Sequence, residues 1–117
     1  MTESPDAVYR IASAAEWREA ERAGVVPLRD IDRRDGYVHL STRGQVLETA
    51  RLHFAAADDL LALEIPLAPL GAQVKFEIAP KRGEAFPHLY GTLRRAHVRA
   101  VIPLMREGAA FSFGTPQ

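Results

Sequence analysis

Hydrophobic and polar residues alternate in several short stretches of this chain, and alternation with a period of two is the pattern of a β-strand. The stretch 60–65 is the most apolar run in the chain, which predicts a strand at the centre of a sheet. The expected strands are 7–12, 37–41, 60–65, 73–78, 98–104 and 110–113.

Two helices are expected between these strands. Ser13 and Glu16 have the spacing of a capping box, and Gly24 is suited to end the helix that they begin. Thr42 and Gln45 form a second pair of the same kind, followed by apolar residues at helical spacing. Each predicted helix therefore has a defined start.

The order of the predicted elements indicates the fold class. Segments 25–36 and 80–87 carry charges and turn residues, and we expect both to form surface loops. Residues 1–6 are polar, and we expect a disordered tail. Because the helices gather early and most strands gather late, the order favours an α+β fold over a parallel doubly wound one. The length of 117 residues predicts a single domain over 1–117.

Composition narrows the classes of function. Fifteen basic residues balance fifteen acidic ones, so the net positive field that a nucleic-acid partner requires is missing, and such a partner is not expected. The absence of cysteine excludes thiolate chemistry, and the histidines show no metal-ligand spacing, so no metal site is expected. The sequence shows neither a signal peptide nor a membrane-spanning run, which predicts a cytoplasmic protein without a membrane partner.

Candidate chemistry first gathers around His39, whose imidazole is suited to acid–base work or ligand binding near neutral pH. Alternation places His39 and Ser41 on one face of their strand, and Arg10 shares that face if the first strand is a neighbour. Ser41 and Thr42 directly precede a helix, whose N-terminal N–H groups favour an anion. The alternatives are that Arg10 is an exposed strand residue, and that Ser41 or Thr42 only caps the helix while His39 bonds to backbone.

A second cluster, 86–91, combines His88 and Tyr90 with a proline and a glycine that constrain the chain. An imidazole and a phenol on a rigid loop suit the wall of a site for a planar ligand ring. The alternative is a structural corner in which the Tyr90 hydroxyl bonds to backbone. The other two histidines, His53 and His97, are expected to be structural or exposed.

Among the carboxylates, Glu77 is notable because it lies within a predicted strand. Alternation directs it outward, away from Val74 and Phe76, which are expected to point inward with Ile78. On that solvated face the simplest partner of Glu77 is a nearby Lys or Arg side chain.

Four segments together resemble a small bacterial family of unknown function, the domain-of-unknown-function family 952. The resemblance covers the chain from about Val8 to Leu104. The segments that carry it are Val8-Tyr9-Arg10-Ile11, Asp35-Gly36-Tyr37-Val38-His39-Leu40-Ser41-Thr42, Val74-Lys75-Phe76-Glu77 and Phe86-Pro87-His88-Leu89-Tyr90-Gly91.

The resemblance implies a fold similar to that of ADP-ribosyltransferases, a split, mainly antiparallel sheet with a cleft that holds nicotinamide adenine dinucleotide (NAD) in those enzymes. By that similarity Arg10 would hold the ribose or diphosphate, and Ser41 and Thr42 would brace the cleft. Tyr90 would stack on nicotinamide. Glu77 would bond to the ribose hydroxyl and stabilise an oxocarbenium-like transition state.

These observations lead to a small-ligand pocket formed by Arg10, Ser41, Thr42 and Tyr90, with His39, His88 and Glu77 as catalytic candidates. The enzyme hypothesis is transfer or hydrolysis of an ADP-ribosyl group, with NAD as the cosubstrate. The competing hypothesis is a non-catalytic module that binds a nucleotide-like or anionic metabolite or a protein, and a third makes the motifs structural. Both ligand hypotheses predict that His39 and His88 meet at one concave surface, with Arg10 on the same side of the sheet.

Overall fold

The computed structural model describes residues 6–117 and contains three α-helices and seven β-strands in that range. Two 3-10 turns, Gly71–Gln73 and Arg95–His97, complete the regular structure. The expected tail lies outside the described residues apart from Asp6. The bounds in chain order are β1 Ala7–Ser13, α1 Ala14–Ala23, α2 Asp30–Asp35, β2 Val38–His39, α3 Arg43–His53, β3 Leu60–Pro66, β4 Val74–Ala79, β5 Glu84–Leu89, β6 Ala100–Glu107 and β7 Ala110–Phe113.

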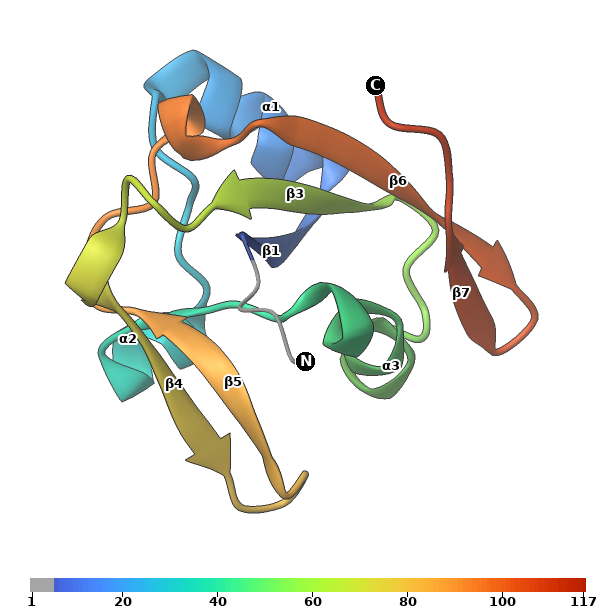
Figure 1. Cartoon of the computed structure of the whole chain (residues 1–117). Helices are drawn as coiled ribbons and strands as arrows, with labels where there is room; N and C mark the ends of the chain where they lie inside the picture. Colours follow the sequence, from blue (N-terminus) through green and yellow to red (C-terminus); the bar gives the residue numbers. More distant parts are fainter. Residues whose placement is uncertain (1–5) are drawn as a thin grey trace.

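The strands form two antiparallel sheets, in the orders β1-β3-β6-β7 and β2-β5-β4. A bridge between Tyr9 and Ser41 links them, with N–H to carbonyl distances of 2.8 Å in both directions. In Figure 1 the β4–β5 hairpin extends away from the larger sheet, at the lower left of the view. The chain is therefore an α+β protein whose sheet is split at β1.

Helices cover both faces of the larger sheet, with α1 on one face and α3 on the other (Figure 1). Alternation along β1 serves both layers, because Val8 packs in the α1 layer whereas Tyr9 and Ile11 pack in the α3 layer. Next to β1 lies β3, the predicted central strand, in which Leu63 and Ile65 are fully buried. No helix among the described residues is long and apolar enough to cross a membrane.

The predicted starts of the two longer helices are found at the expected residues. The Ser13 side chain accepts from the N–H of Glu16 at 3.1 Å, and Glu16 accepts from the N–H of Ser13 at 2.8 Å. Gly24 ends α1 in the left-handed conformation, with φ of +82°. At the start of α3, Thr42 N–H donates to Gln45 Oε1 at 3.0 Å.

Helix α2 corrects the prediction of a surface loop over 25–36 and raises the helix number from two to three. Its sequence, Asp-Ile-Asp-Arg-Arg-Asp, contains a single apolar residue, Ile31, which is itself exposed. Hydrophobic periodicity therefore could not reveal α2. The buried residue of this helix is Asp32, and its partners lie elsewhere in the sequence.

The prediction of a loop over 80–87 is also wrong, since β5 begins at Glu84 and runs through Pro87. Proline lacks an N–H and is rare inside a sheet. Here the carbonyl of Pro87 accepts from Leu40 N–H at 3.1 Å, just beyond the end of the two-residue strand β2. The N–H that Pro87 lacks would therefore lie beside Leu40, beyond the last residue pair of the β2–β5 ladder.

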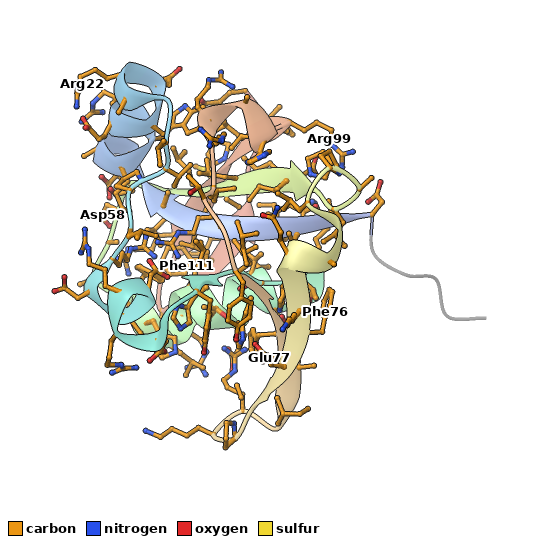
Figure 2. The ribbon with its side chains drawn as sticks, turned by 90° about the vertical axis from the view of Figure 1, so that its left-hand side faces the viewer. Arg22, Asp58, Phe76, Glu77, Arg99 and Phe111 are labelled. Atoms are coloured by element: carbon orange, nitrogen blue, oxygen red, sulfur yellow. The ribbon has the colours of Figure 1, made fainter. Side chains whose placement is uncertain are left out.

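The orientation predicted for 73–78 is wrong as well. Phe76 and Ile78 are 45% and 65% exposed, and Val74 alone of the three apolar residues packs against the core. Figure 2 shows Phe76 and Glu77 on opposite sides of β4. Glu77 lies on the face that carries His88, because Lys75 pairs with His88 and alternation puts Glu77 on the same face as Lys75.

Candidate functional site

A buried ion pair between Arg10 and Asp32 is the base of the site. Arg10 on β1 donates to both carboxylate oxygens of Asp32, at 3.1 Å from Nη1 and 2.7 Å from Nη2. The two residues are only 1% and 2% exposed. A buried charge needs a partner with good geometry, and this two-point pair supplies one. Arg10 also donates to the carbonyl of His39 at 3.0 Å, which ties β1 to β2.

His39 lies between two carboxylates. Its Nδ1 is 2.8 Å from Asp32 Oδ1, and its Nε2 is 3.0 Å from Asp35 Oδ2. The backbone N–H of His39 also donates to Asp32, at 3.0 Å. On its other side Asp35 accepts from Arg34 at 2.9 and 3.3 Å. Both ring nitrogens of His39 are therefore engaged.

The two aspartates are ionised at neutral pH. Burial raises the pKa of Asp32, but the hydrogen bonds from His39 and Arg10 outweigh burial and hold that pKa far below its ordinary value. The hydrogen bond from Arg34 lowers the pKa of Asp35, with a further contribution from His39. Because a carboxylate only accepts, each of these two contacts requires a proton on the His39 nitrogen that makes it.

His88 lies directly opposite His39 on the neighbouring strand β5, with ring centroids 5.8 Å apart. Its Nδ1 is 2.8 Å from Glu77 Oε1, and the same oxygen accepts from the Tyr90 hydroxyl at 2.7 Å. The hydrogen bonds from Tyr90 and His88 lower the pKa of Glu77, and Glu77 in turn raises the pKa of Tyr90 to about 12. Tyr90 is therefore a neutral donor, and its hydroxyl bonds to a side chain rather than to backbone.

Tyr37 holds the two histidines in place from one side. Its ring stacks on His88 at 3.9 Å between centroids, with an angle of 20° between planes. The rings of His39 and Tyr90 lie 4.6 and 5.3 Å from the same ring. This packing fixes the plane of His88 as well as the position of its nitrogens.

A cleft of about 840 Å³ opens in front of the two histidines, between β1, α3 and the β4–β5 hairpin. Its volume lies in the range of small-molecule sites, roughly 300–1,000 Å³. Asp35 is the one carboxylate among its lining residues in the described part of the chain. The cationic side chains that line it are Arg10, Arg29, Arg34, Lys81 and Arg82.

The structure brings four of the predicted site residues to this cleft and leaves three outside its lining. These are His39, His88, Arg10 and Ser41. Because Tyr9 pairs with Ser41, strand alternation puts Arg10 on the opposite face of β1, from which it reaches Asp32 and the carbonyl of His39. Thr42 is at the start of α3. Glu77 and Tyr90 are behind His88 instead of facing the cleft.

Three residues that hold this site were missed by the sequence analysis, namely Asp32, Asp35 and Tyr37. The sequence held one signal for Asp32, since an arginine within a strand of apolar residues requires a carboxylate partner. Nothing in the sequence identified which acidic residue would supply it, because Arg10 and Asp32 are 22 positions apart.

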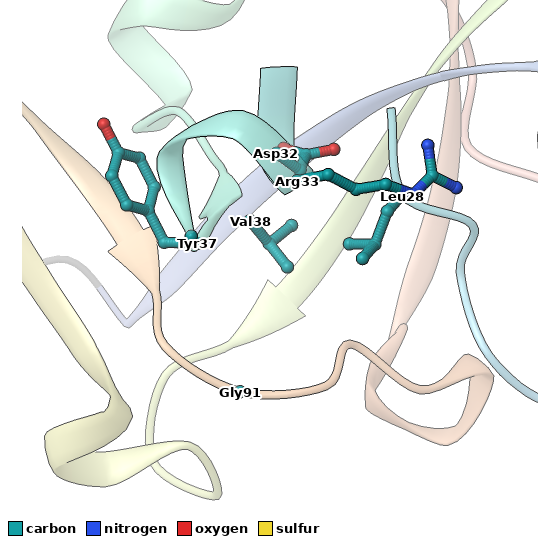
Figure 3. A pocket seen from close by; sticks show the side chains of 7 residues that line it. Leu28, Asp32, Arg33, Tyr37, Val38 and Gly91 are labelled. Carbon is teal, nitrogen blue, oxygen red and sulfur yellow. The ribbon is translucent and has the colours of Figure 1, made fainter. Parts of the chain in front are cut away.

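A smaller pocket of about 230 Å³ lies beside α2, and Figure 3 shows its lining. Leu28 and Val38 supply its apolar wall, and Gly91 closes it from the segment after β5. Tyr37 lines this pocket as well as the cleft. Within the described residues no group of three or more His, Asp or Glu side chains has the geometry to hold a metal ion.

The fold and the site together define a small α+β protein with a split antiparallel sheet and a histidine-lined cleft. The chain belongs to the family described as protein of unknown function (DUF952), whose sequence profile matches residues 11–101. This agrees with the resemblance carried by the histidine motifs. No curated protein matches the sequence significantly.

Solved structures of the Caulobacter crescentus protein CC0527 are similar to this chain along almost all of its length. A crystal structure is 34% identical, covers 95% of this chain and 93% of the other, and has a TM-score of 0.81. A solution NMR structure of the same protein is 33% identical, covers 91% and 90%, and has a TM-score of 0.78.

Proposed function

We propose that this protein binds a small phosphate-bearing ligand of nucleotide or dinucleotide size in the cleft in front of His39 and His88. The observation that carries the proposal is the lining of the cleft, in which five cationic side chains and three histidines meet a single carboxylate. Of the five, Arg10 and Arg29 already pair with Asp32 and Glu16. An anion gains from such a lining because the charges are held in place before it binds.

The two rims of the cleft support a ligand with more than one anionic group. Lys81 and Arg82 lie at the turn between β4 and β5, whereas Arg34 lies on α2 at the opposite rim. Arg82 is positioned by its hydrogen bond to Thr49, at 2.9 Å. Apolar side chains between the rims, Leu52 and Phe54 among them, suit a base or sugar ring.

The finer form of the proposal is an ADP-ribosyltransferase-like scaffold that takes NAD. A sheet split at β1, with the cleft at the split, supports it. In the enzyme version the protein transfers or hydrolyses an ADP-ribosyl group, and in the module version it binds the nucleotide without reaction. Glu77 acts through His88 in either version, since it does not line the cleft.

A thermal-shift screen with NAD, ADP-ribose, mononucleotides and sugar phosphates tests the proposal. A ligand at one hundred times its dissociation constant adds about 2.7 kcal/mol to the stability, which raises the melting temperature by several degrees in a domain of this size. Nicotinamide release from NAD separates the enzyme from the module. A screen in which none of these compounds raises the melting temperature contradicts the proposal.

Alanine variants locate the binding site. His39→Ala and His88→Ala are each expected to abolish the shift given by the best ligand while lowering the stability of the ligand-free protein by about 1 kcal/mol. His97→Ala is the matched control, because it removes an imidazole that does not line the cleft. Retention of the full shift in both cleft variants would make the two histidines structural.

A further inference from the structure

His39 and His88, two of the three histidines that line the cleft, differ in which nitrogens remain free. Within the described residues, His88 Nε2 has no hydrogen-bond partner, whereas both nitrogens of His39 are bonded to carboxylates. No polar side-chain atom in that part of the chain is both fully buried and unpartnered. His88 lines the cleft, and its unpartnered Nε2 is therefore not fully buried.

Glu77 determines which tautomer of His88 is present. The carboxylate of Glu77 can only accept, so the Nδ1 that lies 2.8 Å from it must carry a proton. In the neutral ring Nε2 then carries the lone pair. A carboxylate, a histidine held by it and a second nitrogen facing a cleft form the arrangement of an oriented general base.

Stacking completes the orientation. Tyr37 lies parallel to the His88 ring at 3.9 Å, and Tyr90 fixes the Glu77 oxygen by donating to it at 2.7 Å. Both contacts leave the Nε2 edge of the ring free. His39 offers no comparable lone pair, because its geometry requires a proton on each nitrogen.

We propose that His88 Nε2 is the proton acceptor of this cleft, with Glu77 as its positioning residue. The acceptor takes a proton from a water molecule or a substrate hydroxyl held beside the bound phosphate, so this inference rests on the proposed function. The lone pair of Nε2 takes the proton, the oxygen keeps its electron pair, and the imidazolium that results donates Nδ1–H to Glu77.

Nitrogen NMR of the histidine side chains tests the tautomer without any substrate. In the wild type above the pH at which the ring is protonated, His88 is expected to be the Nδ1–H tautomer. In Glu77→Ala it is expected to move toward the Nε2–H form that free histidine prefers. Glu77→Gln keeps an acceptor oxygen and should restore the wild-type tautomer, and Tyr90→Phe should leave it unchanged. An Nε2–H tautomer in the wild type would overturn the assignment.

Chemical modification tests the reactivity of the lone pair. Diethylpyrocarbonate reacts with an unprotonated imidazole nitrogen, and the four histidines fall on four different tryptic peptides, so mass spectrometry separates them. His88 is expected to be modified in the folded protein at pH 7, while His39 is spared. His97, which does not line the cleft, provides the reference rate. Modification of His39 at a rate equal to that of His88, or protection of His88 alone, contradicts the proposal.

Inorganic phosphate distinguishes failure of this inference from failure of the proposed function. If the cleft binds an anion, phosphate slows modification of His88 and leaves His97 less affected. Selective modification of His88 without any phosphate protection would contradict the anion site and still support Nε2 as the free base. Protection by phosphate together with the Nε2–H tautomer in the spectrum would support the anion site and contradict Nε2 as the free base.

Discussion

At the scale of single residues, the site depends on one buried carboxylate. Asp32 accepts five hydrogen bonds, from Arg10 twice, from His39 twice and from the backbone of Arg29. These bonds neutralise a buried guanidinium and fix the ring that faces the cleft. Removal of this carboxylate would therefore leave a buried charge without a partner.

Replacement of Asp32 should destabilise the protein strongly. Asp32→Asn is expected to lower the free energy of unfolding by about 3–5 kcal/mol, because Arg10 stays buried without a counter-charge. The matched control is Asp30→Asn in the same helix, where an exposed pair with Arg33 is removed and the change should stay within about 0.5 kcal/mol. Urea unfolding measures both, and equal losses in the two variants would show that burial of the pair is irrelevant.

Acid should lower the stability of the protein through the same carboxylate. The folded-state pKa of Asp32 lies below its ordinary value of 3.8, so its contribution is complete above that pH and is lost as the pH falls toward the folded-state pKa. The fall in stability between about pH 5 and about pH 2 should therefore be smaller in Asp32→Asn than in the wild type. Denaturant unfolding across this range checks it, and parallel curves would contradict the shift.

At the scale of elements, the short helix α2 positions the carboxylates of Asp32 and Asp35. Gly36 ends it in the left-handed conformation, with φ of +83°, and its N–H donates to the Asp32 carbonyl at 2.8 Å. Tyr37 and β2 follow directly. The conformation of one glycine thus sets the path from the carboxylates to His39.

Two glycine substitutions should change the stability of the protein in opposite directions. Gly36→Ala is expected to destabilise by about 1–2 kcal/mol, since an L residue is strained at positive φ even though no atom obstructs the added methyl group. Gly44→Ala, in the first turn of α3 with open space around it, should stabilise by about 0.4–1 kcal/mol. Thermal unfolding compares them, and the same sign in both variants would contradict the argument.

At the scale of the whole molecule, the two sheets differ in how well other elements cover them. The larger sheet is covered on both faces, whereas β4 is an edge strand with two exposed apolar side chains. The hairpin joins the rest through β2 and the pair at Tyr9 and Ser41. Regions with few buried contacts open at lower free energy than the core.

Hydrogen exchange should reveal this difference. Amides of Ala62 and Leu63 in β3 are expected to exchange slowest, and those of β4 at least about tenfold faster through local opening. A ligand in the cleft should slow exchange in the hairpin most, because the hairpin forms one wall. Equal protection of β3 and β4 would show that the two sheets open as one unit.

The sequence by itself determined the features that depend on neighbouring residues. The capping pairs at Ser13 and Thr42, the apolar run of β3 and the terminal strand β7 are local patterns, and the structure has them at the expected residues. The motifs with His39 and His88 were sufficient to indicate the family.

Tertiary structure decided the features whose partners are distant in the sequence. Helix α2 has no apolar stripe and is held through Asp32, whose partner Arg10 lies on another element. Glu77 faces His88 because the register of β4 on β5 pairs Lys75 with His88. Pro87 stays in a strand because its carbonyl still accepts from Leu40 N–H, just beyond β2. Local patterns report which residues prefer burial, but a charged side chain can be buried only where the fold brings its counter-charge, and that depends on contacts between distant segments.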